Sequence, residues 1–246
     1  MKLFLYVLAC LFSVTNIFAQ KNAGSITLLD KKWEETDSEK KAKYFIHKYR
    51  VNDTTWLFDY YNFKGPKIRQ ESYRDAAGKK PNGFYAYYNE EGVLDSCGNI
   101  FGNLKSDTWT YFKGETWKDV AYKTFENGVL VKVETKPDTS VTKLNVELES
   151  SFPGGQRGWQ QFLGKNLRYP DRAVDLRISG NVIVMFIVNQ QGKINEPMIS
   201  KSVEYSLDEE TLRIITISPD WEPAVMNGRN VNSYKRQPIT FKLTRG

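Results

Sequence analysis

The pattern of apolar and polar positions predicts a helix followed by a hairpin in the last hundred residues. Pro153-Gly154-Gly155 interrupts regular secondary structure, and the apolar residues from Trp159 to Leu167 that follow recur at helical spacing. Residues 180–188 are almost all apolar, which is typical of a central strand covered on both faces. A turn ending at Gly192 then leads into a second strand, Lys193–Lys201. Together these segments predict an antiparallel hairpin preceded by an amphipathic helix.

A second helix and a final strand complete this part of the pattern. A helix is predicted near Ser206–Ile217, with Ser206 as its N-cap, Glu209 three residues later and Pro219 beyond its end. The last strand, Ser233–Leu243, alternates and directs Ile239, Phe241 and Leu243 inward. These elements predict a three-stranded antiparallel sheet with two helices on one face, in which Ser233–Leu243 is an edge strand.

Residues 21 to about 135 have a different pattern, in which aromatic residues gather in short alternating runs. The runs Trp56–Tyr61, Tyr85–Tyr88 and Trp109–Phe112 each end in an aromatic pair followed by a glycine turn. Their spacing of about 25 residues is a repeat period. Asn127-Gly128 marks a tight hairpin turn. We therefore predict a continuous antiparallel β-meander of hairpin repeats from Trp56 to Leu130, with the aromatic pairs mostly on one face, packed as a core rather than exposed as a ligand platform.

These predictions give an α+β chain. Its expected parts are a signal peptide or anchor over residues 1–19, a β-hairpin repeat domain over 20–135, a linker and lead-in over 136–148, and a C-terminal α+β domain over 149–246. The short polar stretch Lys136–Ser140 provides the expected boundary.

The N-terminus fits three interpretations. Leu3 to Phe18 is mostly apolar and Ala19 suits the position before a signal-peptidase cut, which favours a cleaved secretory signal and a periplasmic location. The same stretch, on the short side for a spanning helix, is also compatible with a retained inner-membrane anchor. A loose lipid-attachment motif at Cys10 is the third interpretation.

Charge and residue chemistry exclude several function classes. The chain has 246 residues and a net charge of +6, but its cations are scattered among 29 acids, so we expect no nucleic-acid partner. His47 is the single histidine, expected at a surface or cross-strand position, and Cys97 has no histidine beside it. No phosphate-binding glycine loop or metal-ligand spacing is present in the sequence. We therefore expect neither an enzyme nor a protein with a bound cofactor or metal.

The order of landmarks from Phe152 to Leu243 resembles the C-terminal domain of the TonB family of energy transducers. The landmarks are Phe152-Pro153-Gly154-Gly155, Tyr169-Pro170, the hairpin, the second helix, Trp221-Glu222-Pro223-Ala224 and the last strand. In that family the last strand accepts an extended segment of an outer-membrane receptor by β-augmentation. The resemblance implies partner-binding positions at Tyr169, Pro170, Tyr234, Arg236, Pro238, Thr240 and Lys242. Less specifically, the aromatic runs resemble MORN-type and YwqK-type hairpin repeats.

Two functions follow from the resemblance. One is a TonB-like component that couples an inner-membrane proton-driven motor to a TonB-dependent receptor for transmembrane transport. The other is an exported, non-energised periplasmic module that binds an envelope protein segment. Leu3–Ala19 lacks the histidine that the family's anchors commonly carry, and the family's proline-rich spacer is replaced by the aromatic repeats. Both departures weigh against energy coupling and leave the domain prediction intact.

Overall fold

A computed structural model of the chain describes residues 24–114, 119–135 and 146–243. The chain divides into two compact units between residues 136 and 137. The predicted signal or anchor, Trp117 and the polar stretch Lys136–Ser140 lie outside the described residues.

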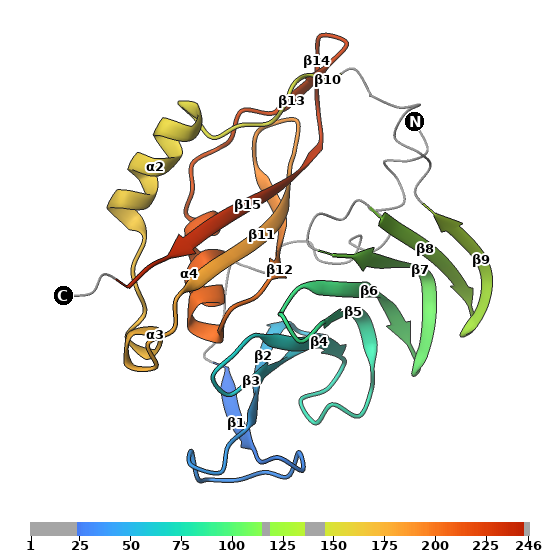
Figure 1. The fold of residues 1–246 in the computed structure, drawn as a ribbon. Helices are drawn as coiled ribbons and strands as arrows, with labels where there is room; N and C mark the ends of the chain where they lie inside the picture. Colours follow the sequence, from blue (N-terminus) through green and yellow to red (C-terminus); the bar gives the residue numbers. More distant parts are fainter. Residues whose placement is uncertain (1–23, 115–118, 136–145, 244–246) are drawn as a thin grey trace. The chain divides into compact units, whose positions relative to one another are not determined.

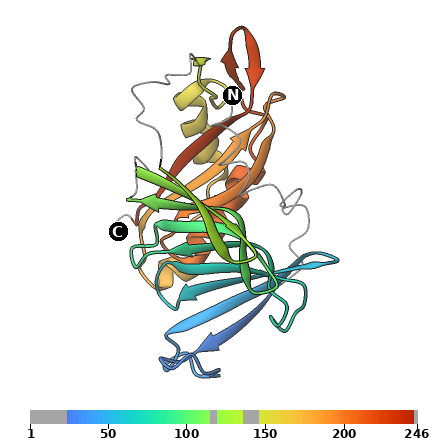
Figure 2. The ribbon, with the colours of Figure 1, turned by 90° about the vertical axis from the view of Figure 1, so that its right-hand side faces the viewer.

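The N-terminal unit is a nine-stranded sheet in which every strand pairs antiparallel with the next along the chain. The order and the strong twist can be followed in Figures 1 and 2. This confirms the predicted meander. The strands are β1 (Ser25–Leu29), β2 (Tyr44–Asn52), β3 (Thr55–Asn62), β4 (Lys67–Tyr73), β5 (Asn82–Tyr88), β6 (Leu94–Phe101), β7 (Leu104–Lys113), β8 (Asp119–Glu126) and β9 (Val129–Thr135).

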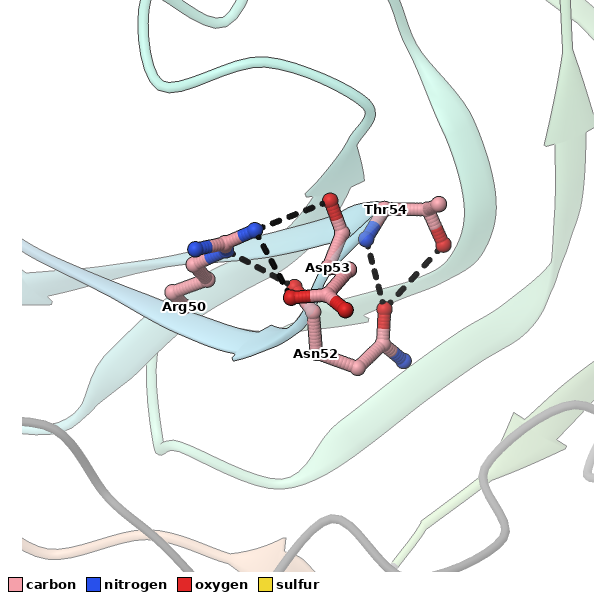
Figure 3. A network of polar contacts seen from close by, with 4 residues as sticks. All are labelled: Arg50, Asn52, Asp53 and Thr54. Carbon is pink, nitrogen blue, oxygen red and sulfur yellow. Dashed lines mark hydrogen bonds and ion pairs between the residues drawn. The ribbon is translucent and has the colours of Figure 1, made fainter.

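Turn chemistry explains why the strands connect so tightly. Between β2 and β3, Asn52 Oδ1 accepts a hydrogen bond from the Thr54 amide at 2.9 Å, and Arg50 pairs with Asp53 at 3.0 Å (Figure 3). Asn and Asp favour such turns because their side chains bond to nearby backbone amides. Between β8 and β9, Asn127 and Gly128 both have positive φ, as a two-residue hairpin turn requires.

The prediction that the aromatic pairs lie mostly on one face is wrong. Adjacent residues of a strand point to opposite faces, so each pair is split between two layers. Tyr60 packs with Phe58 and Tyr73 on one face. Its neighbour Tyr61 stacks on Phe45 on the other, with ring centroids 5.3 Å apart. The aromatic residues therefore pack on both faces of the sheet, which agrees with a core role.

A buried cluster of polar side chains lies on the same face of the meander as Tyr61. The Lys67 ammonium lies 3.2 Å from Asp59, and both side chains are buried. Gln70 donates to the same carboxylate at 2.7 Å. His47 is opposite Asp59 in the β2–β3 register and is buried, so its cross-strand position is confirmed and a surface position is wrong. Charged groups are tolerated inside because each is paired.

The C-terminal unit contains a three-stranded antiparallel sheet in the order β12-β11-β15, as predicted (Figure 1). β10 falls within Leu144–Leu148, which the sequence predicts as an alternating strand or extended lead-in, and belongs to a small second sheet, β10-β13-β14; the third helix and strands β13 and β14 were not predicted. They were missed because their segments are too short to show a period. The elements are β10 (Val146–Leu148), α2 (Gly155–Asn166), α3 (Asp171–Asp175), β11 (Gly180–Val188), β12 (Ile194–Lys201), α4 (Tyr205–Thr216), β13 (Ala224–Met226), β14 (Arg229–Val231) and β15 (Ser233–Phe241).

An aromatic cluster forms the centre of the C-terminal core. The indole of Trp221 meets Phe186 of β11 at 5.0 Å, Phe152 at 5.6 Å and Trp159 of α2 at 5.9 Å, measured between ring centroids. The Trp221 amide also donates to the carbonyl of Gly192 at 2.8 Å. Trp221 therefore joins the sheet, α2 and the β11–β12 turn. Beyond this cluster the core includes Ile239 and Phe241 of β15, whereas Leu243, predicted to face inward, is exposed.

Helix α4 begins one residue earlier than predicted and has a different cap. Its N-cap is Glu204, whose carboxylate accepts from the Ser206 amide at 2.8 Å, so the prediction of Ser206 as N-cap is wrong. Glu204 is fully buried and pairs with Arg172 of α3 at 2.6 Å. Glutamate is an uncommon N-cap. Here the tertiary ion pair fixes the carboxylate where it can also cap the helix.

Candidate functional site

Strand β15 forms one edge of the C-terminal sheet, as predicted. Within the described residues its strand partner is β11 alone, along the whole length from Ser233 to Phe241. An edge strand presents backbone N–H and C=O groups on its outer side, which can pair with another extended chain.

Pro238 shows which backbone groups of β15 point outward. Proline has no N–H to donate, so within a sheet it is tolerated where its nitrogen faces away from the neighbouring strand. Pro238 lies opposite Ile183 in an unbroken register, and because it has no N–H we assign this as a non-hydrogen-bonded pair, whose backbone groups point to the open side. Backbone groups alternate in direction along a strand. Thr240, two residues on, therefore directs its N–H to the open side, whereas Ile239 directs its own toward β11.

The side chains of β15 divide between two faces. Ile239 and Phe241 point into the core beneath the helices. Thr240 lies on the other face and its hydroxyl donates to Asn181 Oδ1 at 3.2 Å. Tyr234, Arg236 and Pro238 share the parity of Thr240 and lie opposite Ile187, Met185 and Ile183 of β11. Residues 233–242 include three cations, Lys235, Arg236 and Lys242, and no acid. The strand itself therefore has a net positive charge, and its exposed cation is Lys242, whereas Lys235 is half-buried and donates to the Ser150 carbonyl at 2.6 Å. A positively charged strand favours an acidic partner.

A pocket of about 460 Å³ opens at the C-terminal end of the strand. Leu167, Tyr169, Thr240, Phe241 and Lys242 line it. The Tyr169 ring meets the Phe241 ring edge-on at 5.7 Å, and its hydroxyl donates to the Ile178 carbonyl at 2.6 Å. Burial raises the pKa of the Tyr169 hydroxyl, so it stays protonated and keeps this donor role at neutral pH. Leu167, Tyr169 and Phe241 contribute apolar surface to the pocket, and Thr240 and Lys242 contribute polar groups, which suits a side chain that flanks an added strand.

Three buried or half-buried charges hold the Tyr169 wall in place. Glu210 of α4 accepts from the Arg168 amide at 2.7 Å. Arg213 donates to the Asn166 carbonyl at 2.7 Å and pairs with Glu210, whose hydrogen bond raises the pKa of the guanidinium. Glu204 binds Arg172. Glu210 and Arg213 join α4 to Arg168 and to the end of α2, and Glu204 joins the start of α4 to α3, so both ends of the segment that carries Tyr169 are fixed.

The structure brings the predicted positions together at one edge. Tyr169, Thr240 and Lys242 share the pocket, and Tyr234, Arg236 and Pro238 continue along the strand. Pro170 has a different place: it is the N-cap residue of α3 and is absent from the pocket lining. Leu167 and Phe241 line the pocket but were assigned to the core alone. The alternation of β15 could not reveal this, because a core residue at a sheet edge also borders the outside.

We also searched the described residues for metal sites and for helices that could span a membrane. There, His, Cys, Asp and Glu form no group of three that could hold a metal ion. None of the described helices is long and apolar enough to cross a membrane.

Comparison with known proteins addresses only the C-terminal unit. No curated protein and no solved structure matches the chain. The match to a family begins near the end of α2 and ends two residues after β15, so it contains Tyr169, the hairpin, α4 and the whole edge strand. It does not include the meander. Residues 165–243, 79 of the chain's 246, match the family described as Gram-negative bacterial TonB protein C-terminal.

Proposed function

We propose that the C-terminal unit binds an extended, acidic segment of a cell-envelope protein as an added strand on β15. The observation that carries this proposal is the open edge: β15 pairs with β11 alone among the described strands, and Thr240 directs its amide outward beside a preformed pocket. Main-chain hydrogen bonds would supply affinity, and the pocket and the cations would supply selectivity. The matched family makes an outer-membrane TonB-dependent receptor the first partner to test.

We also propose that the protein is exported to the periplasm and has a binding rather than a catalytic role. Coupling to an inner-membrane proton-driven motor requires that Leu3–Ala19 be retained as an anchor. The alternative is a free periplasmic binding module. The N-terminal residue of protein recovered from the envelope separates the two: Gln20 indicates the free module, and Met1 in the membrane fraction indicates the anchored component.

Replacing Thr240 by proline should weaken binding without unfolding the unit. The substitution removes the outward N–H and places a ring in the path of an added strand, while an edge strand tolerates proline. Loss of the hydrogen bond alone should weaken binding by roughly threefold to tenfold. Affinities for synthetic peptides from the N-terminal segments of the source organism's outer-membrane receptors would measure this.

Thr240→Val is the matched control, because valine keeps the amide and the shape of the side chain. We expect it to bind within about twofold of the unaltered protein, since it loses only the exposed contact with Asn181. Equal affinity of the proline and valine variants, both folded by circular dichroism, would exclude β15 as the binding edge.

A further inference from the structure

The last strand of the meander is unusually apolar for an exposed strand. The exposed fraction is 63% for Val129, 47% for Leu130, 50% for Val131 and 55% for Val133. These four residues make up most of the seven-residue strand β9. A strand of this kind at a sheet edge is a template for pairing with another chain, and proteins normally protect such edges.

The opposite edge of the same sheet is covered at the Leu28–Leu29 end of β1. The segment after β1 folds back along it: the Thr36 amide donates to the Leu28 carbonyl at 3.0 Å, and Glu35 forms an isolated bridge with Leu29. β9 has β8 as its strand partner and no other among the described strands. The protein therefore covers one end of the meander and leaves an apolar strand at the other.

The second half of β9 has the regular geometry that strand pairing needs. Its register with β8 shifts once, between Thr124 and Phe125, and is regular from Lys132 onward. From there Val133 and Thr135 lie on one face and Lys132 and Glu134 lie on the other, whereas Val131 is the extra residue at the register shift. Lys132 and Glu134 already form an ion pair of 2.6 Å within the strand.

We propose that β9 pairs antiparallel with β9 of a second copy of this chain, about a two-fold axis through Val133. In this register Val133 lies opposite Val133 of the second copy, Val131 lies opposite Thr135, and Lys132 lies opposite Glu134. The axis is perpendicular to the sheet, so each face of one meander continues into the same face of the other. The contact is isologous and closes after two copies.

Charge complementarity is the reason for choosing a second copy over another partner. The sequence Lys132-Val133-Glu134 is self-complementary in antiparallel order, so the dimer contains two cross-strand pairs of opposite charge and a β-branched centre, both of which stabilise sheets. A slip that centres the axis on Lys132 would oppose two lysines and put Leu130 against Glu134. The strand's own sequence thus disfavours this slip.

The paired segment is a single short strand from each copy, so the interface is small and we expect a dissociation constant in the micromolar range. Sedimentation equilibrium of the full exported chain at up to roughly 100 µM should show a monomer–dimer equilibrium at that strength. Lys132→Glu and Glu134→Lys should each weaken it by roughly tenfold, because each opposes like charges twice. An equimolar mixture of the two variants should dimerise as strongly as the unaltered protein, because each acidic side chain of one variant then faces a lysine of the other.

Disulfide cross-linking tests the register of the two β9 strands independently of the dimer's affinity. Val133→Cys should form a disulfide-linked dimer on oxidation, because directly opposed residues of antiparallel strands have Cα atoms about 4.5–5.5 Å apart, within disulfide range. Lys132→Cys is the matched control and should not cross-link to itself, because it faces Glu134. A chain that stays monomeric, a dimer indifferent to both charge reversals, or a β9 that captures only a different protein would each overturn the proposal.

Discussion

Replacing Trp221 by alanine should unfold the C-terminal unit more readily than any other single truncation proposed for this chain. The indole is 3% exposed and contacts three aromatic rings from β11, α2 and the segment before α2. Its Nε1–H also donates to Ser218 Oγ at 3.1 Å. Truncating a buried tryptophan costs about 3–5 kcal/mol of unfolding free energy. Denaturation of the whole chain, with hydrogen exchange of β11 amides reporting on this unit, would measure the loss.

Trp33 supplies the control for this prediction. It is 40% exposed and stacks on Tyr44 at the periphery of the meander. Its alanine variant should leave the exchange of the β11 amides unchanged and should destabilise the meander by less, about 1–2 kcal/mol. A loss below about 1 kcal/mol on Trp221→Ala would mean that the aromatic cluster is not the centre of this core.

Replacing Glu204 by alanine should lower the unfolding free energy by about 2–4 kcal/mol. The substitution removes an N-cap, worth about 1 kcal/mol, and a charged hydrogen bond to Arg172, worth about 1.5–3 kcal/mol. Arg172 is 35% exposed, so water can recover part of its solvation and the loss stays below that for a fully buried pair. The same denaturation experiment applies.

Glu204→Gln separates the two contributions, because glutamine keeps an acceptor for the Ser206 amide and loses the charge that binds Arg172. We expect roughly half the loss of the alanine variant. Alanine and glutamine variants that both match the unaltered protein would show that the contact between α3 and α4 contributes nothing, and that the pocket wall is held by Glu210 and Arg213.

The strands and long helices could be predicted because their periods are intrinsic to the sequence. β11 is apolar at nearly every position, and its predicted bounds coincide with the observed ones, because a central strand needs both faces covered. The edge position of β15 was predicted from the family resemblance and its alternation, and the topology confirms it. The meander followed from turn residues, since Asn127-Gly128 determines a hairpin locally.

What could not be predicted depends on contacts between distant segments. Glu204 caps α4 because Arg172, thirty-two residues earlier, holds its carboxylate in place, and no local pattern contains that information. The pocket joins Leu167 and Tyr169 to Thr240–Lys242 across about seventy residues of chain. The split of Tyr60 and Tyr61 between two faces is different: the alternation of a strand already required it. A dense run of aromatic residues on a strand therefore supplies both faces of the sheet.

Amide hydrogen exchange at Thr240 tests strand addition to β15 most directly. In the free protein the Thr240 amide should exchange fast, while the Ile239 amide, directed at β11, should exchange slowly. On saturation with a receptor peptide that binds, strand addition predicts that Thr240 becomes protected at least roughly tenfold while Ile239 changes little. Saturated binding with Thr240 exchange unchanged would contradict the account, because a strand added to β15 must accept a hydrogen bond from that amide.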